Sequence, residues 1–248
     1  MAKIIAFYGS PGSGKTTVAL KSAIELYCST KDVRVAFVSP DFNVPSIGLL
    51  FPNHNPDDIY SLSKILDNTD VTEETLLEHT VSVKSMKDFG FFGLKSGDGE
   101  FSFPALNDEK ITSLFNALSE YAEYVFVDCS NDSKDFISKR ALETSDISVR
   151  MITPDTKGMS WLSVNKDLHG KIEGASIFNI VSVTDRDLFI PTEEVCTKFN
   201  SILVVMPYSR NLKQQMLDGR MYERFNDKAY NKRIKTIVSN ILISEGQK

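Results

Sequence analysis

Residues near the start of the chain have types and spacing suited to binding a nucleoside triphosphate. Residues 9–17 read Gly-Ser-Pro-Gly-Ser-Gly-Lys-Thr-Thr, which fits the phosphate-loop pattern Gly-x-x-x-x-Gly-Lys-Ser/Thr. Glycines let the backbone curl so that several amide N–H groups face one anion, and the N-terminus of a following helix adds a positive dipole. We expect Lys15 to contact the β- and γ-phosphates, Thr16 to bind Mg²⁺ and Thr17 to bond the α-phosphate. The predicted nucleotide contacts in this loop are Gly9, Ser10, Pro11, Gly12, Ser13, Gly14, Lys15, Thr16 and Thr17.

Two carboxylates follow strand-like runs and are candidates for the magnesium site. Asp128 ends the apolar run Tyr124–Val127, and Asp41 comes shortly after the run Val35–Val38. Ligands of open α/β sheets bind beyond the carboxyl ends of the strands. We therefore expect Asp128 to hold a magnesium-bound water. Asp41 is expected to bind magnesium through water or to orient the attacking water; the alternative is a turn-forming aspartate after Pro40.

The strands and helices that must position these residues are predicted from the hydrophobic pattern, in which apolar runs alternate with segments that have helical spacing of apolar residues. The predicted strands are Ile4–Tyr8, Val33–Val38, Phe89–Leu94, Tyr124–Asp128, Ser148–Thr153, Ala175–Val181 and Ile202–Met206. The predicted helices are Lys15–Cys28, Asn107–Tyr121, Lys134–Glu143, Lys157–Lys166, Thr192–Phe199, Leu212–Asp218 and Asn226–Ile243. This alternation predicts one α/β domain over residues 1–248, with a doubly wound, mostly parallel sheet and helices on both faces. Residues 51–105 are the least regular, and a short strand pair or a mobile loop is expected there.

The composition restricts the classes of partner. The 248 residues carry a formal net charge of −5, which does not favour direct DNA binding, although local basic patches are allowed. The clearest patch, within residues 228–235, is interpreted first as a solvated helix face. No run reaches the ~18 apolar residues of a membrane span, and we expect neither membrane contact nor a signal peptide. Three widely spaced cysteines, Cys28, Cys129 and Cys196, favour a cytoplasmic protein with free thiols.

Taken together, these residues resemble the MinD/ParA group of P-loop ATPases, and the resemblance covers nearly the whole chain. The loop matches that group's pattern from Gly12 onward. Asp41 matches the second acidic position after strand two, and Asp128 matches the first residue of the group's switch. The resemblance implies ATP and Mg²⁺ as cofactors and an ATP-dependent homodimer. It also implies a protein partner from a pilus-assembly, polarity or partition system.

Later segments extend the resemblance to the base of the nucleotide. Residues 153–155, Thr-Pro-Asp, are similar to the family's threonine-proline-acid turn. Asn179 resembles the asparagine that reads adenine, and the loop beginning at Pro207 resembles the adenine loop. Asn179, Pro207 and Tyr208 are therefore expected to contact the base. Within the group, residues 62–105 look most like the pilus-assembly ATPases called CpaE or TadZ.

Three departures from the family pattern bear on hydrolysis. Ser10 stands where the family has its additional lysine, Ser39 replaces the first acidic residue after strand two, and residues 128–132 lack the switch proline and glycine. ATP binding should survive, because the loop amides, Lys15 and Thr16 remain. Loss of a cationic finger typically costs ~10³-fold or more in phosphoryl transfer, so weak hydrolysis is expected unless Arg210 or another cation substitutes.

The sequence leaves more than one functional class open. The first hypothesis is a weak ATPase that acts as a nucleotide-dependent positioning or assembly switch. The alternative is a kinase- or ligase-type P-loop enzyme with a small-molecule substrate; the lack of a substrate-binding basic cluster near the loop disfavours it. A metallochaperone-type ATPase would need a cysteine pair with metal-ligand spacing, and the sequence has none.

Overall fold

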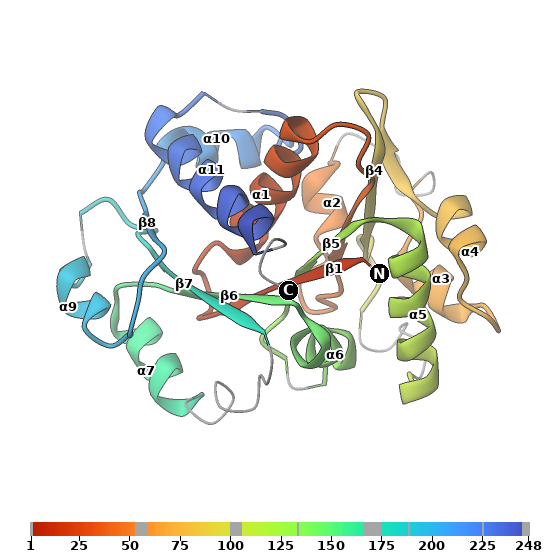
Figure 1. Cartoon of the computed structure of the whole chain (residues 1–248), viewed down its shortest axis with the longest axis horizontal. Helices are drawn as coiled ribbons and strands as arrows, with labels where there is room; N and C mark the ends of the chain where they lie inside the picture. The colour runs from red at the N-terminus through yellow and green to blue at the C-terminus, as the bar shows by residue number, and fades with distance from the viewer. Residues whose placement is uncertain are drawn as a thin grey trace.

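The computed structural model describes residues 2–52, 59–99, 106–132, 134–165, 175–187, 189–224 and 226–244, which surround one large sheet (Figure 1). The sheet has eight strands in the order β3-β4-β2-β5-β1-β6-β7-β8. Their bounds are β1 Lys3–Gly9, β2 Val35–Ser39, β3 Val81–Val83, β4 Met86–Gly93, β5 Tyr124–Asp128, β6 Ile147–Ile152, β7 Ser176–Ser182 and β8 Val204–Met206. Every neighbouring pair is parallel except β3 with β4. The predicted doubly wound, mostly parallel fold is confirmed.

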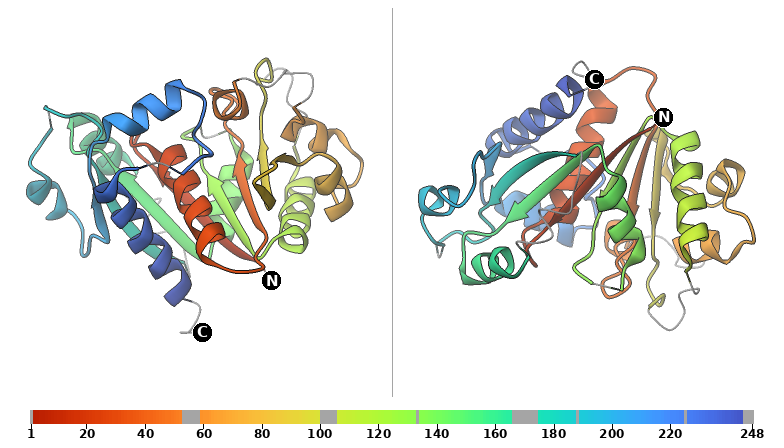
Figure 2. Two further views of the ribbon diagram at one scale, coloured as in Figure 1. Left: turned by 90° about the horizontal axis from the view of Figure 1, so that it is seen from above. Right: turned by 60° about the horizontal axis from the view of Figure 1, so that its bottom comes forward.

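Helices cover both faces of this sheet (Figure 2). One face packs on α1 Lys15–Ser29, α2 Ile47–Leu50 and α11 Lys228–Ile243. The other packs on α3 Leu62–Asp67, α4 Glu73–Glu78, α5 Asp108–Tyr121 and α6 Phe136–Thr144. The remaining described helices are α7 Thr156–Val164, α9 Thr192–Cys196 and α10 Arg210–Leu217. None of the described helices combines the length and the apolar composition that a membrane crossing requires.

The central strands are continuous apolar runs because both of their faces are buried. In β1, Ile5 and Phe7 belong to the cluster beneath α1 and α11, whereas Ala6 and Tyr8 belong to the opposite cluster. Its neighbours β5 and β6 pair with it in register, with Phe7 opposite Asp128 and Gly9 opposite Met151. This register brings the phosphate-binding loop, the end of β5 and the end of β6 to one edge of the sheet.

The region predicted to be irregular contains more structure than expected. Residues 59–99 include α3 and α4, and β3 and β4 form the antiparallel strand pair that was one of the two expectations. Both helices begin at a capping hydroxyl: Ser61 accepts a hydrogen bond from Ser63 N, and Thr72 from Thr75 N. Such caps satisfy amide groups that a short helix leaves without an intrahelical partner. Residues 53–58 and 100–105 of this region lie outside the described residues.

Candidate functional site

The phosphate-binding loop connects β1 to α1 and is curled by glycines. Gly9 has a φ of 148° and Gly14 a φ of 78°, both in the region that side chains rarely adopt. A Cβ on Gly9 would lie 1.8 Å from the carbonyl oxygen of Met151. The amide of Ser10 donates to that same oxygen at 2.9 Å. The first turn of the loop is therefore fixed against β6 before any ligand binds.

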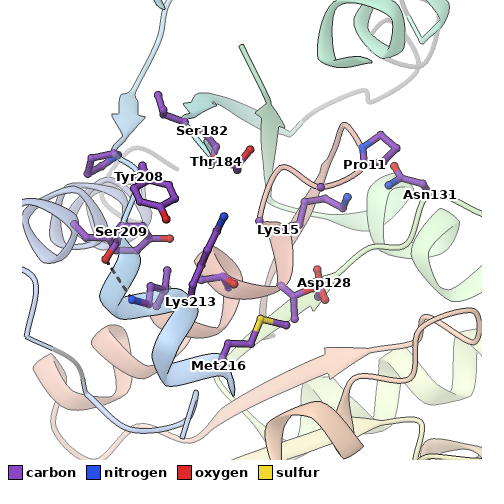
Figure 3. Close-up of a pocket in the computed structure, with 18 of the residues that line it drawn as sticks. Pro11, Lys15, Asp128, Asn131, Ser182, Thr184, Tyr208, Ser209, Lys213 and Met216 are labelled. Carbon is purple, nitrogen blue, oxygen red and sulfur yellow. Dashed lines mark hydrogen bonds between the residues drawn. The ribbon is translucent and has the colours of Figure 1, made fainter. Parts of the chain in front are cut away.

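This loop forms one wall of a cavity of about 620 Å³ at the carboxyl edge of the sheet (Figure 3). The other walls come from Asp41 after β2, from residues 128–131 at the end of β5, from residues 182–184 at the end of β7, and from residues 207–209 with the adjoining α10. A cavity of this size accommodates a nucleotide-sized ligand. Segments from five strand ends, those of β1, β2, β5, β7 and β8, thus converge where ligands of α/β sheets bind.

Lys15 extends along the loop and is held by oxygen acceptors. Its Nζ donates to the carbonyl oxygens of Gly9 and Ser10, both at 3.3 Å. With its amide oriented to satisfy both groups, Asn131 accepts from Lys15 Nζ at 3.0 Å and donates to the Gly9 oxygen at 2.7 Å. Burial lowers the pKa of Lys15, and the nearby Asp128 carboxylate opposes that shift. The ammonium is thus mostly desolvated, which strengthens its attraction for a phosphate.

Asp128 lies beside the loop at the end of β5. It is 5% exposed, and one carboxylate oxygen accepts from Ser39 Oγ at 3.1 Å. Burial raises its pKa to about 6, and hydrogen bonding from the Thr16 hydroxyl and the charge of Lys15 oppose the rise. A threonine hydroxyl next to a carboxylate is an all-oxygen donor set, which suits Mg²⁺. Thr16 and Asp128 therefore fit the predicted magnesium site, and no competing cluster of His, Cys, Asp and Glu occurs among the described residues.

Asp41 forms a turn and also lines the cavity, so its predicted role toward magnesium or water stays a prediction. Its Oδ1 accepts from the amides of Asn43 and Val44, at 2.9 and 3.0 Å, which makes it a turn-forming aspartate. It also lines the cavity together with Asp128. The Asn43 side chain donates to Asp132 Oδ2 at 2.7 Å. This bond connects the loop after β2 to the loop after β5.

Ser10 does not direct its side chain into the cavity. The residue is fully buried, its Oγ accepts from Thr153 N at 3.1 Å and lies 3.2 Å from Thr153 Oγ1. Of the nine loop residues, Gly9, Ser10 and Ser13 do not line the cavity, whereas the other six do. The structure thus places six of the nine predicted contact residues at the cavity wall, and ligand contact by all nine stays a prediction. Gly9 and Ser10 shape the loop, and the buried Ser13 Oγ has no hydrogen-bond partner among the described residues.

The structure gives no support to the prediction that Asn179 reads the base, because this residue does not line the cavity. Its amide oxygen accepts from Arg150 Nε at 2.8 Å, and its amide nitrogen donates to the Ser201 carbonyl at 2.9 Å. Because β7 continues to Ser182, Asn179 lies three residues before the carboxyl edge and outside the cavity. Pro207 and Tyr208 do lie at the cavity wall, as the sequence suggested for the base-binding loop.

Several residues that line the cavity were not singled out from the sequence. Ser182 and Thr184 lie at and just beyond the end of β7, a position that the strand-end rule could have identified. Lys213 comes from α10 and extends into the cavity (Figure 3), with its Nζ 4.9 Å from the centre of the Tyr208 ring. Asn131 follows the end of β5 and is covered by the same rule, whereas no local pattern identifies Lys213, because it reaches the cavity through the packing of α10.

Solved structures provide the comparison with known proteins. No protein-family model and no curated protein sequence matches the chain. A ParA family ATPase of Chlorobium tepidum is 17% identical with a TM-score of 0.75, covering 97% of this chain and 99% of that one. A plasmid partition protein of Borrelia burgdorferi bound to AMPPNP is 19% identical with a TM-score of 0.74, covering 98% and 99%.

A third structure gives the same result. The septum site-determining protein MinD of Pyrococcus horikoshii, complexed with Mg-ADP, is 16% identical with a TM-score of 0.74 and covers 98% of this chain and 99% of its own. All three likenesses extend over nearly the full length of both chains. At these identities they establish the architecture. Together with the sheet order and the loop geometry, they show that the chain has the fold of the ParA/MinD P-loop ATPases.

Proposed function

We propose that the chain binds ATP with Mg²⁺ in the cavity of about 620 Å³. The observation that carries this proposal is the convergence of Lys15, Thr16 and Asp128 beside a curled glycine loop. Bound Mg²⁺ neutralises charge on the β- and γ-phosphates. Thr16 would ligate the ion, and Asp128 and Asp41 would hold its waters. The AMPPNP and Mg-ADP bound to two of the structural neighbours support this choice of ligand.

Nucleotide binding can change the hydrogen bonds of two loops at once, as a nucleotide-dependent switch requires. Lys15 would leave Asn131 and the Gly9 carbonyl to contact the γ-phosphate, so the loop after β5 loses one of its attachments. The Asn43–Asp132 hydrogen bond joins that loop to the loop containing Asp41. We infer that the chain acts as one domain that changes partner affinity with its nucleotide state, as a positioning or assembly switch.

Hydrolysis in this proposal is weak. The side chain of Ser10 is hydrogen-bonded to Thr153. It therefore contributes neither a charge nor a free hydrogen-bond donor at the phosphates. Among the described residues that line the cavity, the cations are Lys15 and Lys213. Lys213 lies against the Tyr208 ring, on the side expected to hold the base. Lys15 alone therefore neutralises the transferred group on the protein side, which gives incomplete electrostatic stabilisation.

The first partner we propose is a second copy of this chain, bound when ATP is present. Exposed apolar side chains on segments bordering the cavity support a protein-binding rim: Val44 is 58% exposed, Phe136 49% and Leu217 82%. A further protein partner would come from a partition, polarity or pilus-assembly system in the cytoplasm. Complex formation by a structural neighbour, the MinC:MinD complex of Aquifex aeolicus, supports partner binding. The pattern in residues 62–105 favours the CpaE/TadZ branch.

One set of experiments tests binding, turnover and assembly together, with turnover followed as phosphate release with and without an added metabolite. Nucleotide affinity is measured by calorimetry, and oligomeric state by light scattering, without nucleotide, with Mg·ADP and with Mg·ATP. Lys15→Ala should weaken ATP binding by about tenfold or more, because charge-assisted phosphate contacts are each worth ~1.5–3 kcal/mol. Lys139→Ala removes an exposed lysine of α6 outside the cavity and is the matched control.

The outcomes separate the proposals. Equal ATP affinity of Lys15→Ala and the unmodified protein would contradict the nucleotide site itself. ATP binding without any change in assembly or partner affinity would contradict the switch. Rapid turnover that appears only with an added metabolite would favour the kinase- or ligase-type alternative.

A further inference from the structure

A polar row crosses the face of the sheet that lies away from α1 and α11. Arg150 in β6 is in register with Tyr8 in β1 and with Asn179 in β7, so the three side chains emerge on one face. Tyr8 is buried, and its ring packs against Trp161 of α7 with centroids 6.2 Å apart. An arginine in the middle of a covered sheet face is unusual, because arginine is rarely buried without a charged partner.

The Arg150 guanidinium is fixed from two sides. Its Nε donates to Asn179 Oδ1 at 2.8 Å, and its Cζ lies 4.9 Å from the centre of the Phe199 ring. These contacts occupy the Nε edge and one planar face of the group. No residue in the described part of the chain accepts a hydrogen bond from the two terminal nitrogens, which form a fork suited to a planar anion.

Among the described residues, no carboxylate forms an ion pair with Arg150. Within the described part of the chain, the ion pairs involve other arginines and lysines, and none includes Arg150. Burial lowers the pKa of Arg150, and Tyr8 opposes that shift. Arginine nevertheless stays charged in proteins. The half-buried and oriented guanidinium therefore forms no ion pair within the described ranges of the chain.

The guanidinium borders a cleft of about 500 Å³ between α7 and α9, two helices that lie beside β6 and β7 (Figure 1). The apolar walls of this cleft are Met159, Leu162, Ile190 and Val195. Glu194 and Lys198 add one charge of each sign, so Arg150 supplies the net positive charge. The cleft shares no residue with the nucleotide cavity.

We propose that this cleft binds a small organic carboxylate with an apolar body, at a site separate from the nucleotide. The Arg150 fork would hold the carboxylate in a bidentate pair, and the apolar walls would cover the rest of the ligand. A net charge of one and apolar walls match a monoanion better than a phosphate, which carries more charge and needs more donors. Asn179 is a positioning residue for Arg150 in this site.

The chain contains a natural probe beside the cleft. Trp161 is its single tryptophan and directly precedes Leu162, one of the lining residues. Octanoate should change Trp161 fluorescence saturably in the full-length protein, with at least about tenfold tighter binding than octanamide, because the amide cannot form the charged bidentate pair. Calorimetry provides a second measure of the same affinities. This comparison needs no substitution, so it does not depend on the folding of a variant.

Two variants assign the binding to the guanidinium. Arg150→Gln should abolish the preference for octanoate over octanamide while ATP affinity stays unchanged. Arg186→Gln removes an arginine whose side chain is 76% exposed and should retain that preference. Equal binding of octanoate and octanamide, no saturable binding of either, or an unchanged preference in Arg150→Gln would each overturn the proposal and leave Arg150 as a structural residue only.

Discussion

Replacing Asp128 by asparagine should stabilise the ligand-free protein and weaken Mg·ATP binding at the same time. Burial raises the pKa of Asp128 from its ordinary 3.8 to about 6, so ionisation of this carboxyl is unfavourable in the folded state. Asparagine has nearly the same shape, keeps an oxygen that can accept from Ser39 Oγ, and carries no charge. It removes the cost of burying the carboxylate, together with the group that would serve the magnesium ion.

The size and sign of the stability change follow from the shift in pKa. A carboxyl whose pKa is higher in the folded state binds protons more tightly there, so stability falls as pH rises from about 4 through about 6. A shift of about two units corresponds to about 3 kcal/mol, which is lost in full only above both pKa values. Because the new amide loses the attraction of Lys15, we expect Asp128→Asn to be more stable than the unmodified protein by about 1–3 kcal/mol at neutral pH.

Urea unfolding of the ligand-free protein measures this difference at several pH values. Between about pH 5 and pH 7.5 the advantage of Asp128→Asn should grow by about 1 kcal/mol. In calorimetry the same variant should bind Mg·ATP about tenfold or more weakly, as expected for the loss of a charge-assisted contact. Glu120→Gln, which alters an exposed carboxylate outside the cavity, should change neither quantity. The reasoning is refuted if Asp128→Asn shows a pH-independent stability difference, or if it binds Mg·ATP as well as the unmodified protein.

Three further predictions concern the base, turnover and α1. Tyr208→Ala should weaken ATP binding by about 1–3 kcal/mol in a displacement assay if the base stacks on this ring; unchanged affinity would place the base elsewhere. Steady-state ATP turnover should lie well below the typical ~10 s⁻¹, and a rapid rate in both the unmodified protein and Lys213→Met would contradict our account of the missing cation. Burial lowers the pKa of Lys21 in α1 to about 7. Its charged form therefore lowers the free energy of unfolding at low pH, and this loss becomes smaller as pH rises. Relative to Lys21→Met, the unmodified protein should therefore gain about 2 kcal/mol in urea unfolding between about pH 7 and pH 9, and a constant difference would show that Lys21 titrates normally.

The parts of the site that follow from local rules could be predicted from the sequence. Lys15 and Thr16 lie at the carboxyl end of β1 because a strand, a glycine loop and a helix follow one another there. This placement depends only on the local sequence. Asp128 ends an apolar run, and parallel pairing with β1 brings it to the same edge. The sheet and its two layers of helices follow from the same alternation of periods.

The remaining features of the site depend on where each strand ends and on contacts with segments that are distant in the sequence. The predicted strand 175–181 differs from the observed β7 by one residue, yet the base-reading role was assigned to Asn179, three residues before the edge. Pairing with β6 and β8 determines where β7 ends, and that pairing cannot be read from a local pattern. The inward direction of the Ser10 side chain depends on Thr153, and the place of Lys213 depends on how α10 packs.

The two outermost strands restrict how this protein can assemble with itself. Both β3 and β8 are only three residues long, and β3 runs against the direction of the other strands. Short edge strands offer few free backbone groups to a neighbouring chain, so another copy cannot readily extend the sheet into a fibril. Ordered association is thereby directed to surfaces made by side chains, whose affinity can change when a bound ligand changes.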